Sequence, residues 1–290
     1  MKTTTSSFSS GRDGLAIATT SWSPDSDPVG VIQVAHGIAE HSGRYVRLAR
    51  ALVDAGYIVY LSDHRGHGNS LGGDVVLGGF GAAGWDALVD DLVAYARAIR
   101  TQHPDLPLFL IAHSLGSFAT QQALLDDSDA WDAVVLTGST ALDIIVQGLA
   151  AAGDGPVGLT AFNAAFENRT GYEWLSRDED EVDKYVNDPL SGFDLPDDTL
   201  PQVFAVAGRL ADPEALAGIR QDLPLLITSG DRDPVGGDGQ LVEVLGQRYQ
   251  GAGITDLTVR LYPEARHEIF NETNRDEITA DIVSWLDAHR

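Results

Sequence analysis

The stretch Ile111-Ala112-His113-Ser114-Leu115-Gly116-Ser117 decides the fold of this chain. It closes the apolar run 108–111, which is typical of a buried strand, and it opens a segment with helical spacing of apolar residues. Small residues on both sides of Ser114 permit a sharp, strained turn from strand to helix. The pattern is A-x-S-x-G, with Ala112 in the place of a first glycine. Such a match also occurs in ordinary turns. Whether Ser114 is catalytic must therefore be judged from the residues that follow the other predicted strands.

Two later apolar runs end in an acid and in a histidine. The run 223–229 is followed by Gly230-Asp231-Arg232-Asp233-Pro234, and the run 259–262 is followed by Pro263-Glu264-Ala265-Arg266-His267. The carboxyl ends of parallel strands lie at one edge of an open sheet, where ligands bind. We therefore expect Ser114, Asp233 and His267 to converge there, in the chain order serine, acid, histidine.

Both the acid and the histidine have competitors. Asp231 lies two residues from Asp233, and we prefer Asp233 because Pro234 restricts its backbone to extended or turn geometry. The chain has eight histidines, and His267 is singled out by its place after the last strand. Those expected near the same edge of the sheet are His36, His64, His67 and His113.

These residue types together can activate a serine for attack on an acyl carbon. The hydroxyl of Ser114 needs a base to take its proton, and the imidazole of His267 titrates in the right range. Asp233 would orient the ring and stabilise its charged form. The loop after the run 31–34 reads Ala35-His36-Gly37-Ile38. We expect the backbone N–H groups of Ile38 and Leu115 to form an oxyanion hole.

Several motifs resemble those of monoacylglycerol lipases and related bacterial lysophospholipase-like hydrolases. The stretch 36–45 matches H-G-x-x-E-H-x-x-R-Y, and 63–70 matches D-x-R-G-H-G-x-S. The elbow, the Gly230-x-x-Asp233 and His267 sites, the stretch 174–178 and Asp188-Pro189-Leu190 agree with them. The resemblance covers about residues 14–286. The departures from it are Ala112 and the acidic composition, and neither changes a catalytic group.

This resemblance implies an α/β-hydrolase fold and a serine hydrolase that cleaves esters of single-acyl-chain lipids through an acyl-enzyme. The implied substrates are monoacylglycerols or lysophospholipids, and no cofactor is implied. Two alternatives stay open: a general carboxylesterase for short-chain or xenobiotic esters, and a catalytically silent binding module with the same fold.

Strand and helix patterns alternate along the chain, which predicts an α/β fold with a mostly parallel sheet flanked by helices. The run 15–22 is expected to be an edge strand. The alternation stops between about residues 139 and 222, which is too long for a simple connection. We therefore predict a core domain of residues 1–138 and 223–290 with a helical cap at 139–222.

The expected cap has two contrasting parts. Within 141–166, the residues Leu142, Ile145, Val146 and Leu149 share one helical face, which could pack on the core or receive an acyl chain. Residues 177–184 are highly charged and are expected to form a solvated helix face. The expected substrate-binding residues are His36, Gly37, His113, Ile145 and Leu149.

Composition sets further limits. The chain has 290 residues, no cysteine and a formal net charge of −24, which opposes binding to nucleic acid and to anionic membranes. No apolar run reaches the length of a membrane span, and residues 1–10 lack an apolar signal region, so we expect a cytoplasmic protein. A transient lipid contact through the cap is compatible with this. We expect no metal site, because His64 and His67 lack a third ligand at suitable spacing. The oligomeric state is not indicated.

Overall fold

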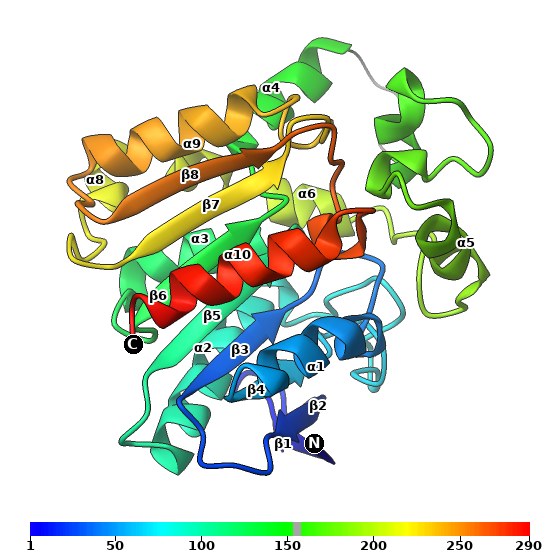
Figure 1. The fold of residues 1–290 in the computed structure, drawn as a ribbon. Helices are drawn as coiled ribbons and strands as arrows, with labels where there is room; N and C mark the ends of the chain where they lie inside the picture. Colours follow the sequence, from blue (N-terminus) through cyan, green and yellow to red (C-terminus); the bar gives the residue numbers. More distant parts are fainter. Residues whose placement is uncertain (153–157) are drawn as a thin grey trace.

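The computed structural model describes residues 1–152 and 158–290, and an eight-stranded sheet runs through it in the order β1-β2-β4-β3-β5-β6-β7-β8 (Figure 1). The six strands from β3 to β8 are mutually parallel, whereas β1 and β2 are antiparallel to their neighbours. The strands are β1 Lys2–Ser9, β2 Ala16–Ser23, β3 Gly30–Ala35, β4 Tyr57–Ser62, β5 Leu108–His113, β6 Ala133–Thr137, β7 Leu225–Gly230 and β8 Leu257–Tyr262.

Helices cover both faces of this sheet. One face carries α1 and α10, and the other carries α2, α3 and α9. Side chains along β5 alternate between the two layers: Leu108 and Leu110 join the core under α2 and α3, while Phe109 and Ile111 join the core under α1 and α10. Strands buried on both faces read as continuous apolar runs, which explains the pattern of 108–111. The helices are α1 Val46–Asp54, α2 Gly84–Gln102, α3 Leu115–Asp127, α9 Gln240–Gly251 and α10 Arg275–Asp287.

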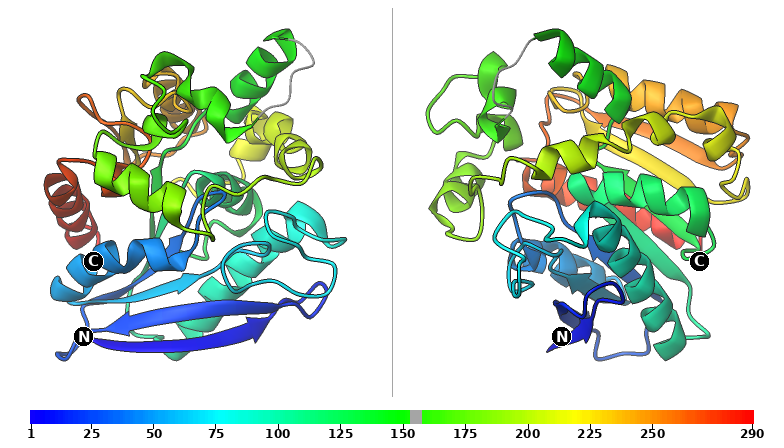
Figure 2. Two further views of the ribbon diagram at one scale, coloured as in Figure 1. Left: turned by 90° about the vertical axis from the view of Figure 1, so that its right-hand side faces the viewer. Right: turned by 180° about the vertical axis from the view of Figure 1, so that it is seen from behind.

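The prediction that the run 15–22 forms an edge strand is wrong. The corresponding strand β2 is paired on both sides, and β1 forms the edge (Figure 2). Strand β1 is rich in serine and threonine and almost fully exposed, so it has no apolar alternation by which a sequence could reveal it. Its side chain Phe8 stacks on Tyr95 of α2 at 5.2 Å between ring centroids.

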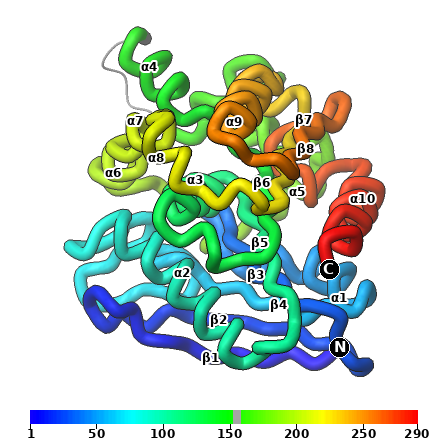
Figure 3. Tube along the Cα trace, turned by 90° about the vertical axis from the view of Figure 1, so that its left-hand side faces the viewer, coloured from blue at the N-terminus to red at the C-terminus, as the bar shows by residue number. Residues whose placement is uncertain are grey.

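The earlier elements of the connection from β6 to β7, α4 and α5, lie beyond the carboxyl ends of the parallel strands (Figure 1). Its later helices return along α2 and α3 and reach α9 (Figure 3). Residues 153–157 of the predicted apolar segment 141–166, among them Asp154, lie outside the described residues. The elements of the connection are α4 Leu142–Ala152, η2 Leu159–Ala165, η3 Glu173–Leu175, α5 Glu179–Asn187, α6 Thr199–Phe204, α7 Ala207–Leu210 and α8 Pro213–Leu216.

The prediction of a solvated charged face at 177–184 is also wrong in part. Glu181 is 7% exposed and pairs with Arg47 of α1 at 2.9 Å. Arg177 pairs with Glu272, which is fully buried. Arg177 and Glu181 therefore tie this segment to the core, whereas Glu179, Asp180 and Lys184 are exposed. Among residues 1–152 and 158–290, no helix combines the length and apolar character needed to cross a bilayer.

Candidate active site

Ser114 occupies a strained turn between β5 and α3. Its backbone angles are φ 49° and ψ −116°, a conformation that residues other than glycine rarely adopt. The turn is held by the backbone, because Ser114 N donates to Thr137 O at 2.9 Å. Gly116 follows at a close approach of chains, since a Cβ at this position would lie 2.6 Å from the carbonyl oxygen of Ala35. The backbone therefore presents the Ser114 hydroxyl at the end of the strand, as the sequence predicts.

His267 and Asp233 form a buried pair. The Nδ1 atom of His267 lies 3.0 Å from both carboxylate oxygens of Asp233. The same carboxylate accepts hydrogen bonds from Ser229 Oγ at 2.6 Å and from Val235 N at 2.9 Å. Asp231 accepts instead from the backbone N–H of Glu264 at 2.7 Å. The structure thus brings Asp233, and not Asp231, to the imidazole.

The charges of this pair favour its ionised form. Burial opposes a charge on His267, but the charge and hydrogen bonds of Asp233 outweigh it, so the pKa of His267 is raised above its usual value. Burial also opposes the charge of Asp233, yet the same interaction holds the pKa of that carboxyl below its usual value. His113, whose ring lies 4.7 Å from that of His267, has a pKa lowered to about 4, mainly by burial. His113 is therefore neutral beside the pair.

Ser114 Oγ and His267 Nε2 are both free to meet a ligand. Neither atom makes a hydrogen bond within the described ranges, and neither is among the fully enclosed polar atoms without a partner. The bond between a nucleophile and its base is often long until substrate is bound. The ring of Trp174 lies 4.9 Å from that of His267 and limits its movement on one side.

Ile38 and Leu115, the expected oxyanion donors, flank the same pocket. In the part of the chain that the structure describes, neither backbone N–H is engaged in a hydrogen bond, and both residues line the pocket that contains Ser114. The turn that contains Ile38 is strained at Ala39, with φ 53°, and is held by a hydrogen bond from Gly37 N to Glu40 Oε1 at 2.5 Å. Two donors of this kind suit a developing oxyanion.

Ser114 opens into an apolar pocket. Ile145 lines it, whereas Leu149 is half-buried on the same helix and is not part of the described lining. The described lining includes no charged side chain. Six of its apolar members are Phe118, Leu142, Ile145, Phe162, Val203 and Phe204.

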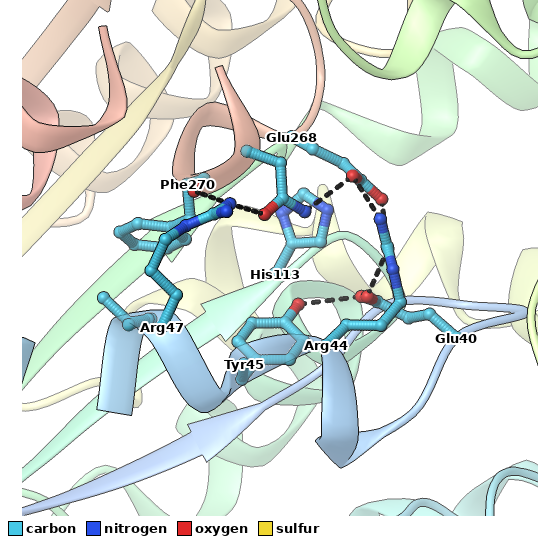
Figure 4. Close-up of a pocket in the computed structure, with 9 residues that line it drawn as sticks. Glu40, Arg44, Tyr45, Arg47, His113, Glu268 and Phe270 are labelled. Atoms are coloured by element: carbon cyan, nitrogen blue, oxygen red, sulfur yellow. Dashed lines mark hydrogen bonds and ion pairs between the residues drawn. The ribbon is translucent and has the colours of Figure 1, made fainter. Parts of the chain in front are cut away.

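The other predicted binding residues lie around the oxyanion turn. His36 is fully buried, with Nδ1 2.7 Å from Gly37 O and Nε2 accepting from His64 N at 2.9 Å, so it supports the turn from behind. The backbone N–H of Gly37 donates a hydrogen bond to Glu40 Oε1. His113 lines a second pocket, shown in Figure 4. The ring centroids of His36 and His67 lie 5.4 Å apart, but the described residues contain no group of three side chains suited to hold a metal.

Sequence reasoning assigned no role to three residues beside the pair: Trp174, Arg44 and Glu268. All three lie within or next to the motifs that carry the family resemblance. That position was the one sequence feature by which they could have been found. Their contacts with His267 and its loop join segments more than 90 residues apart, and local patterning cannot show such contacts.

Comparison with known proteins agrees with this geometry. A family model described as serine aminopeptidase, S33 (Hydrolase_4) matches residues 26–274. A monoacylglycerol lipase of Mycolicibacterium smegmatis is 31% identical over 293 residues, covering 96% of this chain and 95% of that protein. A monoglyceride lipase of Mus musculus is 27% identical, covering 96% of this chain and 88% of that one. The crystal structure of a thermostable carboxyl esterase from Bacillus coagulans in complex with glycerol superposes with a TM-score of 0.86 at 26% identity, covering 99% of each chain.

Proposed function

This chain belongs to the serine aminopeptidase S33 family of α/β-hydrolases, and from that premise we propose that it is a carboxylic ester hydrolase acting on lipids with one acyl chain, such as monoacylglycerols or lysophospholipids. The observation that carries the proposal is the apolar pocket into which Ser114 opens. An acyl chain suits this mostly apolar lining, because the chain itself has no polar group that must lose water on binding.

The same lining argues against a peptidase, although the family description names one. An aminopeptidase must bind the charged amino terminus of its substrate, and a buried ammonium needs a carboxylate or an equivalent partner. The described lining of the Ser114 pocket has no such group.

In the proposed mechanism Ser114 Oγ attacks the ester carbon while His267 Nε2 takes its proton. The N–H groups of Ile38 and Leu115 hold the oxyanion of the tetrahedral intermediate, at about 3–4 kcal/mol for each donor. The C–O bond then breaks, and His267 gives the proton to the leaving alcohol. Water, deprotonated by His267, attacks the acyl-enzyme. A second collapse releases the carboxylic acid and returns the proton to Ser114, while Asp233 orients the ring throughout.

The connection at 139–222 is proposed to act as the cap of this site, on a core of residues 1–138 and 223–290. It supplies Leu142, Ile145 and Phe162 to the pocket. Transient contact of this cap with a lipid surface and a cytoplasmic location are further parts of the proposal. Binding to vesicles and cell fractionation test them separately.

The decisive experiment is labelling with a fluorophosphonate probe. We expect the wild type to be labelled and Ser114→Ala to be unlabelled and inactive. A folded wild type that takes no label would favour a binding module and contradict the proposal. A panel of p-nitrophenyl esters and monoacylglycerols of increasing chain length then tests the substrate. An optimum at acetate or butyrate would favour the general carboxylesterase.

The identity of the acid has its own test. Asp233→Asn should lower kcat by about 10⁴-fold, because the wrong tautomer of His267 would be favoured. Asp231→Asn is the matched control and should retain near wild-type kcat, since Asp231 contacts a backbone N–H and not the imidazole. The reverse result would assign the role to Asp231.

A further inference from the structure

One buried guanidinium joins the two loops that flank the site. Arg44 Nη1 donates to Glu40 Oε2 at 2.8 Å and to Glu268 Oε1 at 2.5 Å, and Arg44 Nη2 donates to Glu268 Oε2 at 2.7 Å (Figure 4). The side chains of Arg44, Glu40 and Glu268 are 9%, 4% and 7% exposed. The planar fork of an arginine can serve two carboxylates in a fixed geometry, whereas the compact ammonium of a lysine cannot.

Glu40 connects this guanidinium to the oxyanion turn. Its Oε1 atom accepts hydrogen bonds from Gly37 N at 2.5 Å and from Tyr45 Oη at 2.7 Å. Gly37 immediately precedes Ile38, whose N–H is the proposed oxyanion donor. The turn is strained at Ala39, so its shape depends on such contacts.

Glu268 connects the same guanidinium to the base, because it directly follows His267 in the chain. These two residues lie in a loop without regular secondary structure. Backbone hydrogen bonds hold the loop on one side, from His267 N to Trp174 O at 3.3 Å and from Glu268 N to Leu175 O at 2.8 Å. The pair with Arg44 holds it from the side of the oxyanion turn.

We propose that Arg44 and Glu268 are positioning residues, and that their ion pair sets the separation between the His267 imidazole and the oxyanion donor at Ile38. The inference rests on the proposed function. Neither side chain contacts the reacting atoms of the mechanism. A misplacement of a catalytic group by 1 Å can cost about 100-fold in rate, so a tie of this kind affects kcat more than substrate binding.

The pH profile of kcat/KM is a second test of the proposal, because charged groups surround His267. The titratable and charged groups that face the imidazole are Asp233, His113, Glu40 and Glu268, with Arg44 between the two glutamates. Loss of the negative charge at Glu268 removes one group that favours the imidazolium. The pH at which kcat/KM falls on the acid side should therefore move lower in Glu268→Gln. It should stay in place in Arg44→Lys, which keeps every charge.

The experiment compares Arg44→Lys and Glu268→Gln with the matched control Glu181→Gln. Glu181 is equally buried and pairs with Arg47, but its chain neighbours do not include a proposed catalytic group. With p-nitrophenyl butyrate we expect kcat to fall about 10- to 100-fold in both variants, with KM unchanged within about twofold. Glu181→Gln should keep the wild-type kcat and pH profile.

Active sites are counted by fluorophosphonate titration, so kcat refers to folded protein even where a variant is partly unfolded. Wild-type kcat per site in Arg44→Lys and Glu268→Gln, or an equal loss in Glu181→Gln, would overturn the proposal. An acid limb that does not move in Glu268→Gln would also count against it. Failure of the proposed function is distinct, because the wild type itself would then neither take the label nor hydrolyse esters.

Discussion

The connection between β6 and β7 contains two segments, called halves below, that meet the core in different ways. Residues 173–192, the ionic half, are tied to the core by three ion pairs, Arg177 with Glu272, Asp178 with Arg275 and Glu181 with Arg47, and by a hydrogen bond between Asp188 and His41. Residues 141–152 and 158–166, the apolar half, line the pocket with Leu142, Ile145 and Phe162 and have one tie to α9, between Asp143 and Arg248.

The two halves have different structural roles. The ionic half accepts hydrogen bonds from the loop that carries His267, through the carbonyls of Trp174 and Leu175, so it holds this loop on one side. The apolar half lines the space for an acyl chain. Directional backbone hydrogen bonds therefore hold the base loop, whereas non-directional apolar contacts shape most of the pocket.

The largest expected effect is on stability, and it separates the two halves. Arg177→Met leaves the fully buried carboxylate of Glu272 without its cation, so the free energy of unfolding should fall by about 3 kcal/mol. The matched variant Arg248→Met breaks the more accessible pair of the apolar half, whose partners are 24% and 15% exposed, and should cost about 1 kcal/mol. Urea unfolding measures the free energy of unfolding of both variants. Equal losses of this free energy would contradict the proposed difference between the two halves.

A smaller effect, confined to long substrates, is expected in the apolar half. Ile145→Trp adds bulk to the wall of the pocket and should lower kcat/KM for long-chain esters about 10-fold relative to butyrate. The control is Val186→Trp, which adds similar bulk on α5 at a side chain that is 43% exposed. Chain-length profiles that change equally in both variants would mean that Ile145 does not bound the acyl site.

The pH dependence of the reaction should follow the Asp233–His267 pair. The base must be neutral to act, and the pKa of His267 is raised, so kcat/KM should begin to fall on acidification above the usual imidazole value of about 6.5. Ile145→Trp should leave this limb unchanged. A wild-type limb clearly below that pH would contradict the charge balance described for the Asp233–His267 pair.

The smallest expected effect is that of salt. The net charge of −24 makes the folded chain repel itself, and salt screens exposed charges far more than buried pairs. Raising NaCl from about 0.02 M to about 0.5 M should therefore raise Tm by about 2 °C. Thermal melts test this, and a lower Tm at high salt would show that the exposed ion pairs outweigh the general repulsion.

The carboxyl ends of β5 and β7 could be predicted because buried parallel strands leave apolar runs that stop abruptly. Strand β8 is an edge strand and only partly buried, and its end was predicted from the short run 259–262. Ser114, Asp233 and His267 follow such runs, and the structure brings their loops together at one edge. The edge strand β1 could not be predicted, because its exposed serines and threonines pair through the backbone alone. The ties of the ionic half were likewise hidden, since the charges of 177–184 look the same in a sequence whether they face solvent or a partner.

The hydrogen bonds from the His267 loop to Trp174 and Leu175 bear on how this protein could be re-engineered. The whole of 139–222 is not an interchangeable module, because a graft of that length would remove the two carbonyls on which the loop rests. Exchange of 141–166 alone would bring a new substrate profile to an unaltered reaction centre. Successful chimeras should therefore have their junctions inside the connection, between the two halves.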